Sequence, residues 1–302
     1  MSMTIKSSVP IILDGGMGRE LQRIGAPFKQ PEWSAQALIE APHFITQVHE
    51  SFIDAGAEII TTNTYALVPF HLGEKQFNQQ GAELIKLAAK IARECVEASP
   101  TVLVAGCIPP LFGSYRADLF SLATAQPLLE VLITNQEVDV DFWLAETLSS
   151  IAEATMIKRR TALTGKSTWI SFTVKDEVTR KSLLRSGESV FDAVSAIAGQ
   201  NVSAILFNCS SVEVMKVALI DAKKALLALN LEDEVQLGVY ANNFPPIGEM
   251  HQANEGISVV RNDISPTVYS QFASSWIDAG ASIVGGCCGI SPAHIKKLAE
   301  LK

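Results

Sequence analysis

Two adjacent cysteines, Cys287 and Cys288, follow a short apolar segment near the end of the sequence. Glycines flank them in the run Gly285-Gly286-Cys287-Cys288-Gly289. Neighbouring cysteines seldom form a disulfide with each other, because a trans peptide strains the required geometry. We therefore expect two free thiols at a strand end, which could bind a soft metal such as zinc as thiolates. Burial as two small residues in a tight turn explains this pair equally well.

A third cysteine in a matching position favours the metal. Cys209 follows the apolar run 203–208, and if both runs are strands of one barrel, their carboxyl ends lie at the same mouth. Three cysteine thiolates with one open position form a recognised type of reactive zinc site. We expect Cys95 to lie in a helix, on its apolar face, as part of the core. Cys107 is expected to line the pocket as an ordinary small residue and not to bind metal.

The chain alternates apolar runs with helix-sized segments, which indicates how these side chains are positioned. We predict eight strands, at 9–13, 58–62, 102–106, 138–144, 168–174, 203–208, 236–240 and 283–284. The segments 51–57 and 275–281 are nearly the same helix ending, and each leads into a strand. This pattern predicts an α/β fold, a single (β/α)8 TIM barrel over residues 1–302. A doubly wound open sheet is the alternative, because alternation alone does not show closure.

Composition narrows the function classes. The chain has 302 residues, of which 48% are hydrophobic and 19% charged, with a formal net charge of -8. Because there is no basic run, we expect neither nucleic acid nor a membrane surface as a partner. We see no signal peptide or membrane span, and the five irregularly spaced cysteines fit a reducing compartment, so we expect a cytoplasmic protein. Nothing in the sequence indicates an oligomeric state.

Several segments together resemble the homocysteine S-methyltransferase family. They are 14–21, 60–65, 145–147, 208–209 and 285–289, and they occur in order over nearly the whole chain. The family includes S-methylmethionine-dependent and betaine-dependent enzymes and the homocysteine-binding module of cobalamin-dependent methionine synthase. The Gly-Gly-Cys-Cys-Gly run paired with an upstream strand-end cysteine is the most specific of these signals.

The resemblance implies a zinc ion (Zn2+) held by Cys209, Cys287 and Cys288, with the thiolate of homocysteine as the fourth ligand. A free alkyl thiol has a pKa of about 8.5 and is mostly protonated at neutral pH, whereas a metal-bound thiol is deprotonated. Three thiolates already exceed the charge of zinc, so the fourth sulfur stays electron-rich and can attack a methyl donor without a general base. The product would be methionine.

The resemblance also implies residues that bind the amino-acid part of the substrate. Asp14 and Glu146, at two strand ends, fit its ammonium group. Backbone N–H groups of the turn from Asp14 to Gly18, with Gly15 and Gly16, and a helix N-terminus could bind its carboxylate. Thr62 and Asn63 are candidates for its other polar contacts. The alternatives are a helix cap for Asp14 and a structural ion pair for Glu146.

Three loops depart from the family pattern, after the third, sixth and seventh strands, including the segment 107–116. These loops would shape the donor side of the site. We expect a small onium donor, S-methylmethionine or adenosylmethionine, because the candidate aromatics for binding a trimethylammonium group are few: Tyr65, Phe112, Tyr115 and Phe244.

Other functions stay open. Betaine, another methyl donor, or a different thiol or selenol acceptor could use the same site, and a non-catalytic zinc- or thiol-binding barrel is the alternative of a different class. Zinc alone needs neither Asp14 nor Glu146, which favours the enzyme. A barrel metallohydrolase is disfavoured, because the five histidines include no His-x-His pair.

Overall fold

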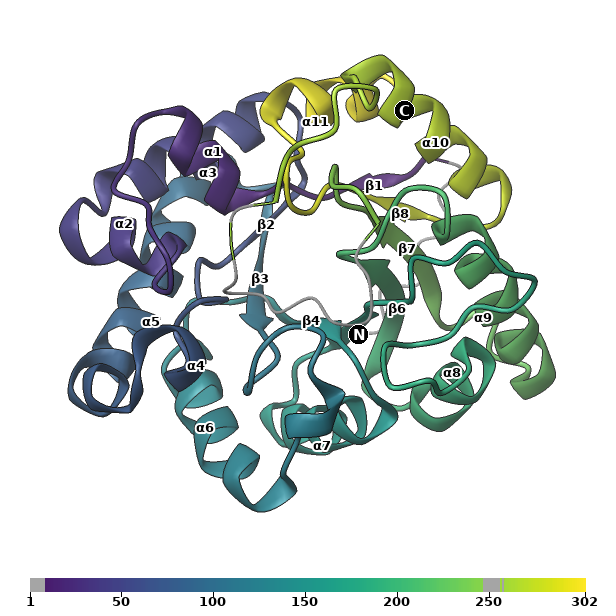
Figure 1. The fold of residues 1–302 in the computed structure, drawn as a ribbon, viewed down its shortest axis with the longest axis horizontal. Coiled ribbons are helices and arrows are strands. Elements are labelled where there is room, and N and C mark those ends of the chain that lie inside the picture. Colours follow the sequence, from purple (N-terminus) through teal and green to yellow (C-terminus); the bar gives the residue numbers. More distant parts are fainter. Residues whose placement is uncertain (1–8, 247–255, 257) are drawn as a thin grey trace.

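Eight parallel strands form a ring surrounded by helices in the computed structural model, which describes residues 9–246, 256 and 258–302 (Figure 1). The strands are β1 (Ile11–Ile12), β2 (Ile59–Thr61), β3 (Leu103–Ile108), β4 (Phe142–Leu148), β5 (Thr168–Phe172), β6 (Val202–Asn208), β7 (Gln236–Tyr240) and β8 (Ile283–Val284). Their order in the sheet is β1-β8-β7-β6-β5-β4-β3-β2. A parallel bridge between Leu13 and Ile59 joins the two ends. The barrel predicted from sequence is confirmed, and the open sheet is wrong.

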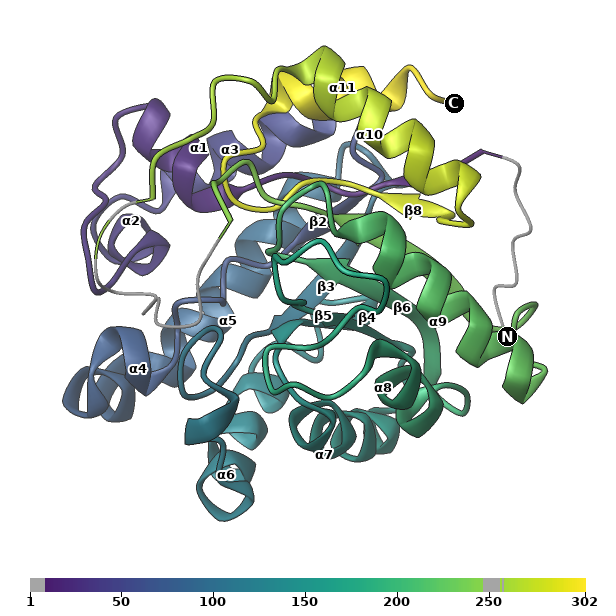
Figure 2. The ribbon, with the colours of Figure 1, turned by 45° about the vertical axis from the view of Figure 1, so that its right-hand side comes forward.

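Helices cover the outside of the ring, as the two views show (Figures 1 and 2). They are α1 (Met17–Arg23), α2 (Ser34–Glu40), α3 (His43–Asp54), α4 (Pro69–Leu72), α5 (Glu74–Val96), α6 (Leu122–Thr134), α7 (Ile151–Thr161), α8 (Val190–Ile197), α9 (Met215–Leu229), α10 (Pro266–Asp278) and α11 (Pro292–Ala299). Short 3-10 turns lie at Ala117–Leu119 and Ala162–Thr164. The extra helices α1, α2 and α4 build the rim beside β1 and β2.

Apolar side chains fill both faces of the strands, because side chains alternate between the two faces and a parallel barrel buries both. One cluster, with Leu13, Leu144 and Leu206 among its members, fills the inside of the ring. A larger cluster, with Ile12, Ala145 and Phe207 among its members, lies between the ring and the helices. This rigid frame positions the residues at the strand ends.

The fourth strand differs from its predicted limits of 138–144. It begins at Phe142 and runs to Leu148, so that Glu146 lies inside the strand and not after it. The pairing with β5 shifts register between Ala145 and Leu148, and Thr147 has a positive φ of 60°. Such a bulge re-aims one side chain, here the Glu146 carboxyl, which lines the pocket at the barrel mouth.

The third strand also runs further than predicted. It continues through Cys107 to Ile108, which the sequence places in a loop.

Among the described residues, none of the helices is both long enough and apolar enough to span a membrane.

One buried polar side chain lies in the helical layer, away from the barrel mouth. His49 on α3 is 0% exposed, and neither ring nitrogen has a hydrogen-bond partner among the described residues. Burial lowers the pKa of His49 from 6.5 to about 4. The ring is therefore neutral in the folded protein at neutral pH, with its polar atoms unsatisfied.

We expect His49→Leu to stabilise the fold by about 1–3 kcal/mol, because it removes unsatisfied buried polar atoms. The pKa of His49 is lower in the folded protein than in the unfolded chain, so protonation of His49 favours unfolding. The wild-type protein therefore loses about 3 kcal/mol of stability in total as the pH falls from 6.5 towards 4. The gain in the variant should therefore increase at acid pH. Urea unfolding at several pH values measures it, with a leucine at the exposed His43 of the same helix as the control. A variant less stable than wild type at pH 5 would contradict the prediction.

Candidate metal centre and substrate pocket

Three cysteine sulfurs converge at the carboxyl end of the barrel. The Sγ atoms of Cys209, Cys287 and Cys288 all lie within 4.8 Å of one another. Cys209 follows β6 and is buried, and the other two follow β8 and are partly buried. These are the three cysteines that the sequence placed at one mouth, and all three line a single pocket.

The turn that carries Cys287 and Cys288 is held between the ends of its neighbouring strands. The Cys287 N–H donates to Ala241 O at 2.9 Å, and Cys288 O accepts from Asn243 N at 2.8 Å. Gly16 lies against this turn so closely that a Cβ atom there would be 2.6 Å from Cys287 O. A glycine is therefore required at position 16, because any side chain would push the Cys287-Cys288 turn away.

This donor set fits a tetrahedral zinc ion. Zinc–sulfur bonds of about 2.3 Å place neighbouring sulfurs about 3.8 Å apart, which lies within the separation seen here. The Cys209 and Cys287 sulfurs, 2.7 Å apart, would have to separate by about 1 Å. The pocket lies directly beside the three sulfurs, so a fourth ligand could approach from it.

The three thiols differ in pKa. Hydrogen bonds from the Cys209 and Cys287 thiols hold the pKa of Cys288 well below its usual range. Cys288 is therefore the thiol of the group that loses its proton most readily. A metal ion that binds here must displace protons from the other two, so its affinity should fall at acid pH.

Glu146 projects into the pocket and is bound only by neutral donors. Its Oε1 accepts from the Cys107 thiol at 3.0 Å, and its Oε2 lies 3.4 Å from Tyr240 Oη and 3.5 Å from Asn208 Nδ2. No lysine or arginine pairs with it in the part of the chain that the structure describes. The structural ion pair considered for Glu146 is therefore wrong. Burial raises its pKa to about 7.

Cys107 supports this carboxyl and lies outside the group of three sulfurs. It is fully buried, and burial raises the pKa of its thiol well above its usual range, so it remains a hydrogen-bond donor. The expectation that Cys107 is not a ligand agrees with this position. Its contact with Glu146 is a role that the sequence did not indicate.

Asp14 follows β1 and lines the same pocket. Its two carboxylate oxygens accept from the backbone N–H of Thr61 at 2.7 Å and from the Thr61 hydroxyl at 3.2 Å. Helix α1 begins after Gly16 without a side-chain cap, so the helix-cap alternative for Asp14 is wrong. Burial raises its pKa to about 8, and the nearby charge of Glu146 adds to this.

The remaining predicted substrate residues also line the pocket, but several of their polar groups are already bonded. Gly15 and Gly16 both line it. The Gly16 N–H donates to Ile290 O at 2.9 Å, so it cannot bind a substrate carboxylate as expected. The Thr62 hydroxyl donates to Gln136 at 2.7 Å, and the Asn63 amide donates to Ser34 O at 3.3 Å.

The pocket has a volume of about 210 Å³ and an aromatic wall that is larger than the sequence predicted. Its aromatic lining residues are Phe28, Trp33, Tyr65, Tyr115, Tyr240 and Phe244. Phe112 is not among them and packs on Phe120 instead, with ring centroids 6.4 Å apart. The set is richer than the sparse one expected, because the rim segment before α2 folds over the barrel mouth.

Arg19 on α1 is a further lining residue that the sequence analysis did not select. Its guanidinium lies 5.3 Å from the centre of the Phe244 ring. The only signal for it in the sequence is its place directly after the glycine turn 15–18. The pocket thus combines three thiols, a buried and a partly buried acid, aromatic faces and a cation.

Fold and site together define a (β/α)8 barrel with a three-thiol centre at its carboxyl mouth. A sequence profile of the homocysteine S-methyltransferase family matches residues 11–301. The chain therefore belongs to the homocysteine S-methyltransferase family, and it is an enzyme of that kind.

Relatives support this assignment over nearly the full length. The homocysteine S-methyltransferase of Escherichia coli (strain K12) is 29% identical over 310 residues, covering 95% of this chain and 94% of that protein. A selenocysteine methyltransferase of Astragalus bisulcatus is 26% identical over 96% of this chain and 91% of that protein. The metallated form of the E. coli homocysteine methyltransferase MmuM superposes with a TM-score of 0.77 at 27% identity, covering 98% of this chain and 97% of that one.

Proposed function

We propose that this chain, as one domain spanning residues 1–302, transfers a methyl group from a small onium donor to the thiol of homocysteine in a zinc-dependent reaction. The observation that carries the proposal is the convergence of three cysteine sulfurs with the acids Asp14 and Glu146 in one pocket. A relative whose structure is described as a metallated form supports a bound metal in this protein. The five free cysteines fit a cytoplasmic location.

Cys209, Cys287 and Cys288 would hold the zinc ion. Bound zinc would supply deprotonation of the acceptor thiol at neutral pH. Glu146 and Asp14 would orient the acceptor by binding its ammonium group, and the ammonium charge would in turn favour their ionised forms. The aromatic wall would exclude water and face the positive charge of the donor.

A sulfonium donor is the better match to the acids and thiols present. When a sulfonium loses its methyl group to a thiolate, the leaving sulfur departs as a neutral thioether and needs no proton. The tertiary amine released from a trimethylammonium donor is a poorer leaving group than a thioether. The aromatic faces of the pocket fit either cation. We therefore propose S-methylmethionine or adenosylmethionine as the donor, on the chemistry of the leaving group.

We expect S-methylmethionine to support methionine formation at least tenfold faster than betaine at equal concentrations, because of this difference in leaving group. Methionine production from homocysteine, measured with each donor separately, checks it. Cys209→Ala protein in the same assay controls for uncatalysed transfer. A rate with betaine equal to or above that with S-methylmethionine would contradict the sulfonium assignment without contradicting the proposed metal site.

A selenol acceptor is the second candidate, favoured by the relatives named as selenocysteine methyltransferases. The same assay with selenocysteine in place of homocysteine separates the two acceptors. A higher rate with selenocysteine would change the acceptor assignment.

A further inference from the structure

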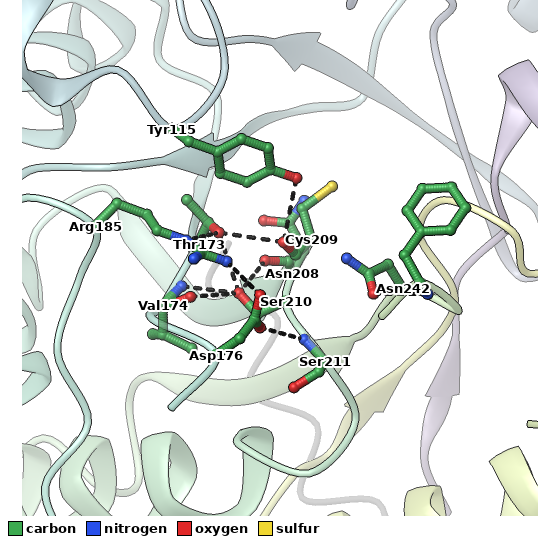
Figure 3. A network of polar contacts seen from close by, with 11 residues as sticks. Tyr115, Thr173, Val174, Asp176, Arg185, Asn208, Cys209, Ser210, Ser211 and Asn242 are labelled. Carbon is green, nitrogen blue, oxygen red and sulfur yellow. Dashed lines mark hydrogen bonds and ion pairs between the residues drawn. The ribbon is translucent and has the colours of Figure 1, made fainter. Parts of the chain in front are cut away.

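Cys209 has a backbone conformation that its surroundings must hold in place. Its φ is 50°, in the left-handed region, which costs a non-glycine residue about 1–2 kcal/mol. Its carbonyl oxygen accepts from Tyr115 Oη at 3.4 Å and from Thr173 Oγ1 at 3.3 Å. Figure 3 shows both side chains directed at this carbonyl from different loops. The two hydroxyl groups therefore fix the peptide that follows the proposed ligand.

The next two residues are tied to the loop after β5. Ser210 Oγ lies 2.9 Å from both the backbone nitrogen and the backbone oxygen of Val174. The Ser211 N–H donates to Asp176 Oδ1 at 2.7 Å. Residues 209–211 therefore cannot relax to an extended conformation without breaking several buried hydrogen bonds.

Arg185 contacts the side chains that hold residues 209–211. Its Nη2 donates to Asp176 Oδ2 at 2.9 Å, and its Nε donates to Thr173 Oγ1 at 3.4 Å. Its guanidinium lies 5.0 Å from the centre of the Tyr115 ring. In Figure 3 it lies below Tyr115 and reaches towards Thr173. One side chain thus links the loops after β3, β5 and β6.

The Arg185–Asp176 pair is buried, with side-chain exposures of 8% and 3%. A buried ion pair contributes little net stability, because desolvation of the two charges offsets their attraction. The planar guanidinium of Arg185, which carries several N–H donors, is better suited to fixing the geometry of its neighbours. Two of those neighbours, Tyr115 and Thr173, bond to the Cys209 carbonyl, and Asp176 accepts from the nearby Ser211 N–H.

We propose that Arg185 is a positioning residue for the metal centre. By pairing with Asp176 and stacking on Tyr115, it holds the left-handed backbone of Cys209 and keeps its sulfur beside those of Cys287 and Cys288. The proposal rests on the proposed zinc site and requires no knowledge of the methyl donor. Outer partners that orient metal ligands typically change metal affinity by about 10–100-fold when removed.

Arg185→Met tests the role, because methionine keeps length but removes the charge and the planar donors. Zinc affinity is measured on the full chain by competition with a chromophoric chelator, and ligand geometry by the sulfur-to-metal absorption of the cobalt-substituted protein. Arg160→Met is the matched control, since Arg160 pairs with Glu130 on the α6–α7 surface, remote from the three cysteines. Because Arg185→Met removes a cationic partner of the buried Asp176 carboxylate, the double variant Arg185→Met with Asp176→Asn is measured beside it.

We expect zinc affinity to fall at least tenfold in the folded Arg185 variants, with an altered cobalt spectrum, and to stay unchanged in the control. If the single variant does not fold, the double variant decides. Zinc affinity and a cobalt spectrum equal to wild type in either folded variant would overturn the positioning role. Wild-type protein that binds no zinc would instead overturn the proposed function, so the two failures are distinguishable.

Discussion

Replacing Cys209 by alanine should remove nearly all zinc from the purified protein, to the same extent as replacing Cys287. The physical reason is that each supplies one of three protein thiolates, and the two that remain leave two of the four tetrahedral positions without a protein ligand, too few for tight binding. Among the described residues, no other His, Cys, Asp or Glu belongs to this group, so no side chain is placed to replace a lost sulfur. Methyl transfer should be lost together with the metal.

Metal analysis of the purified variants provides the measurement, with one zinc per chain expected for wild type. Cys95→Ala is the matched control, because Cys95 lies on α5, where its thiol contacts Thr46 O at 3.9 Å, and is not one of the three grouped sulfurs. It should keep full zinc. Full zinc in the Cys209→Ala protein would show that this residue is not a ligand.

The sequence predicted the barrel and the meeting of the three thiols for the same reason. Strand, turn and helix signals are local, and eight repeats of them leave few arrangements in which parallel strand ends meet. Once Cys209 and Cys287 are placed at the ends of β6 and β8, the fold brings them together. Closure itself depends on Leu13 and Ile59, which are far apart in the sequence, and so it needed the structure.

The walls of the pocket could not be predicted in this way. Phe28 and Trp33 reach the barrel mouth because the segment before α2 folds back over it, and Trp33 does so with a positive φ of 49°. No periodic pattern encodes such a loop conformation. The limits of β4 were also misjudged, because the strand continues through an irregular register past Glu146 to Leu148, where the end of an apolar run would suggest that it stops.

The bonding of backbone groups shows the same limit. The Gly15-Gly16 turn was identified correctly as part of the pocket wall, yet the Gly16 N–H is bonded to Ile290 O. Glycine is needed at position 16 because the Cys287-Cys288 turn approaches it closely. A sequence motif shows that a glycine is required, whereas only coordinates show whether the reason is a ligand or a neighbouring chain segment.

Glu146→Gln should weaken homocysteine binding by about 1.5–3 kcal/mol while zinc content stays at the wild-type level. Glutamine keeps the shape of the side chain but loses the charge that would bind the substrate ammonium. Isothermal titration calorimetry at pH 8 measures it. Glu153→Gln is the control, because Glu153 is another buried glutamate, bonded to Ser149 N at 2.9 Å at the start of α7. Equal affinities in wild type and Glu146→Gln would reduce Glu146 to a structural residue.

The pH dependence of this difference tests the same assignment independently. Because burial raises the pKa of Glu146 to about 7, the carboxyl of the unbound protein is charged above that pH and neutral below it. Wild type then gains affinity over Glu146→Gln as pH rises through 7 and loses the gain below it. Proton release from the acceptor thiol occurs in both proteins and cancels in the ratio of their dissociation constants. We therefore expect the ratio to fall towards one between pH 8 and pH 6, and a ratio constant over this range would show that the Glu146 charge does not bind the substrate.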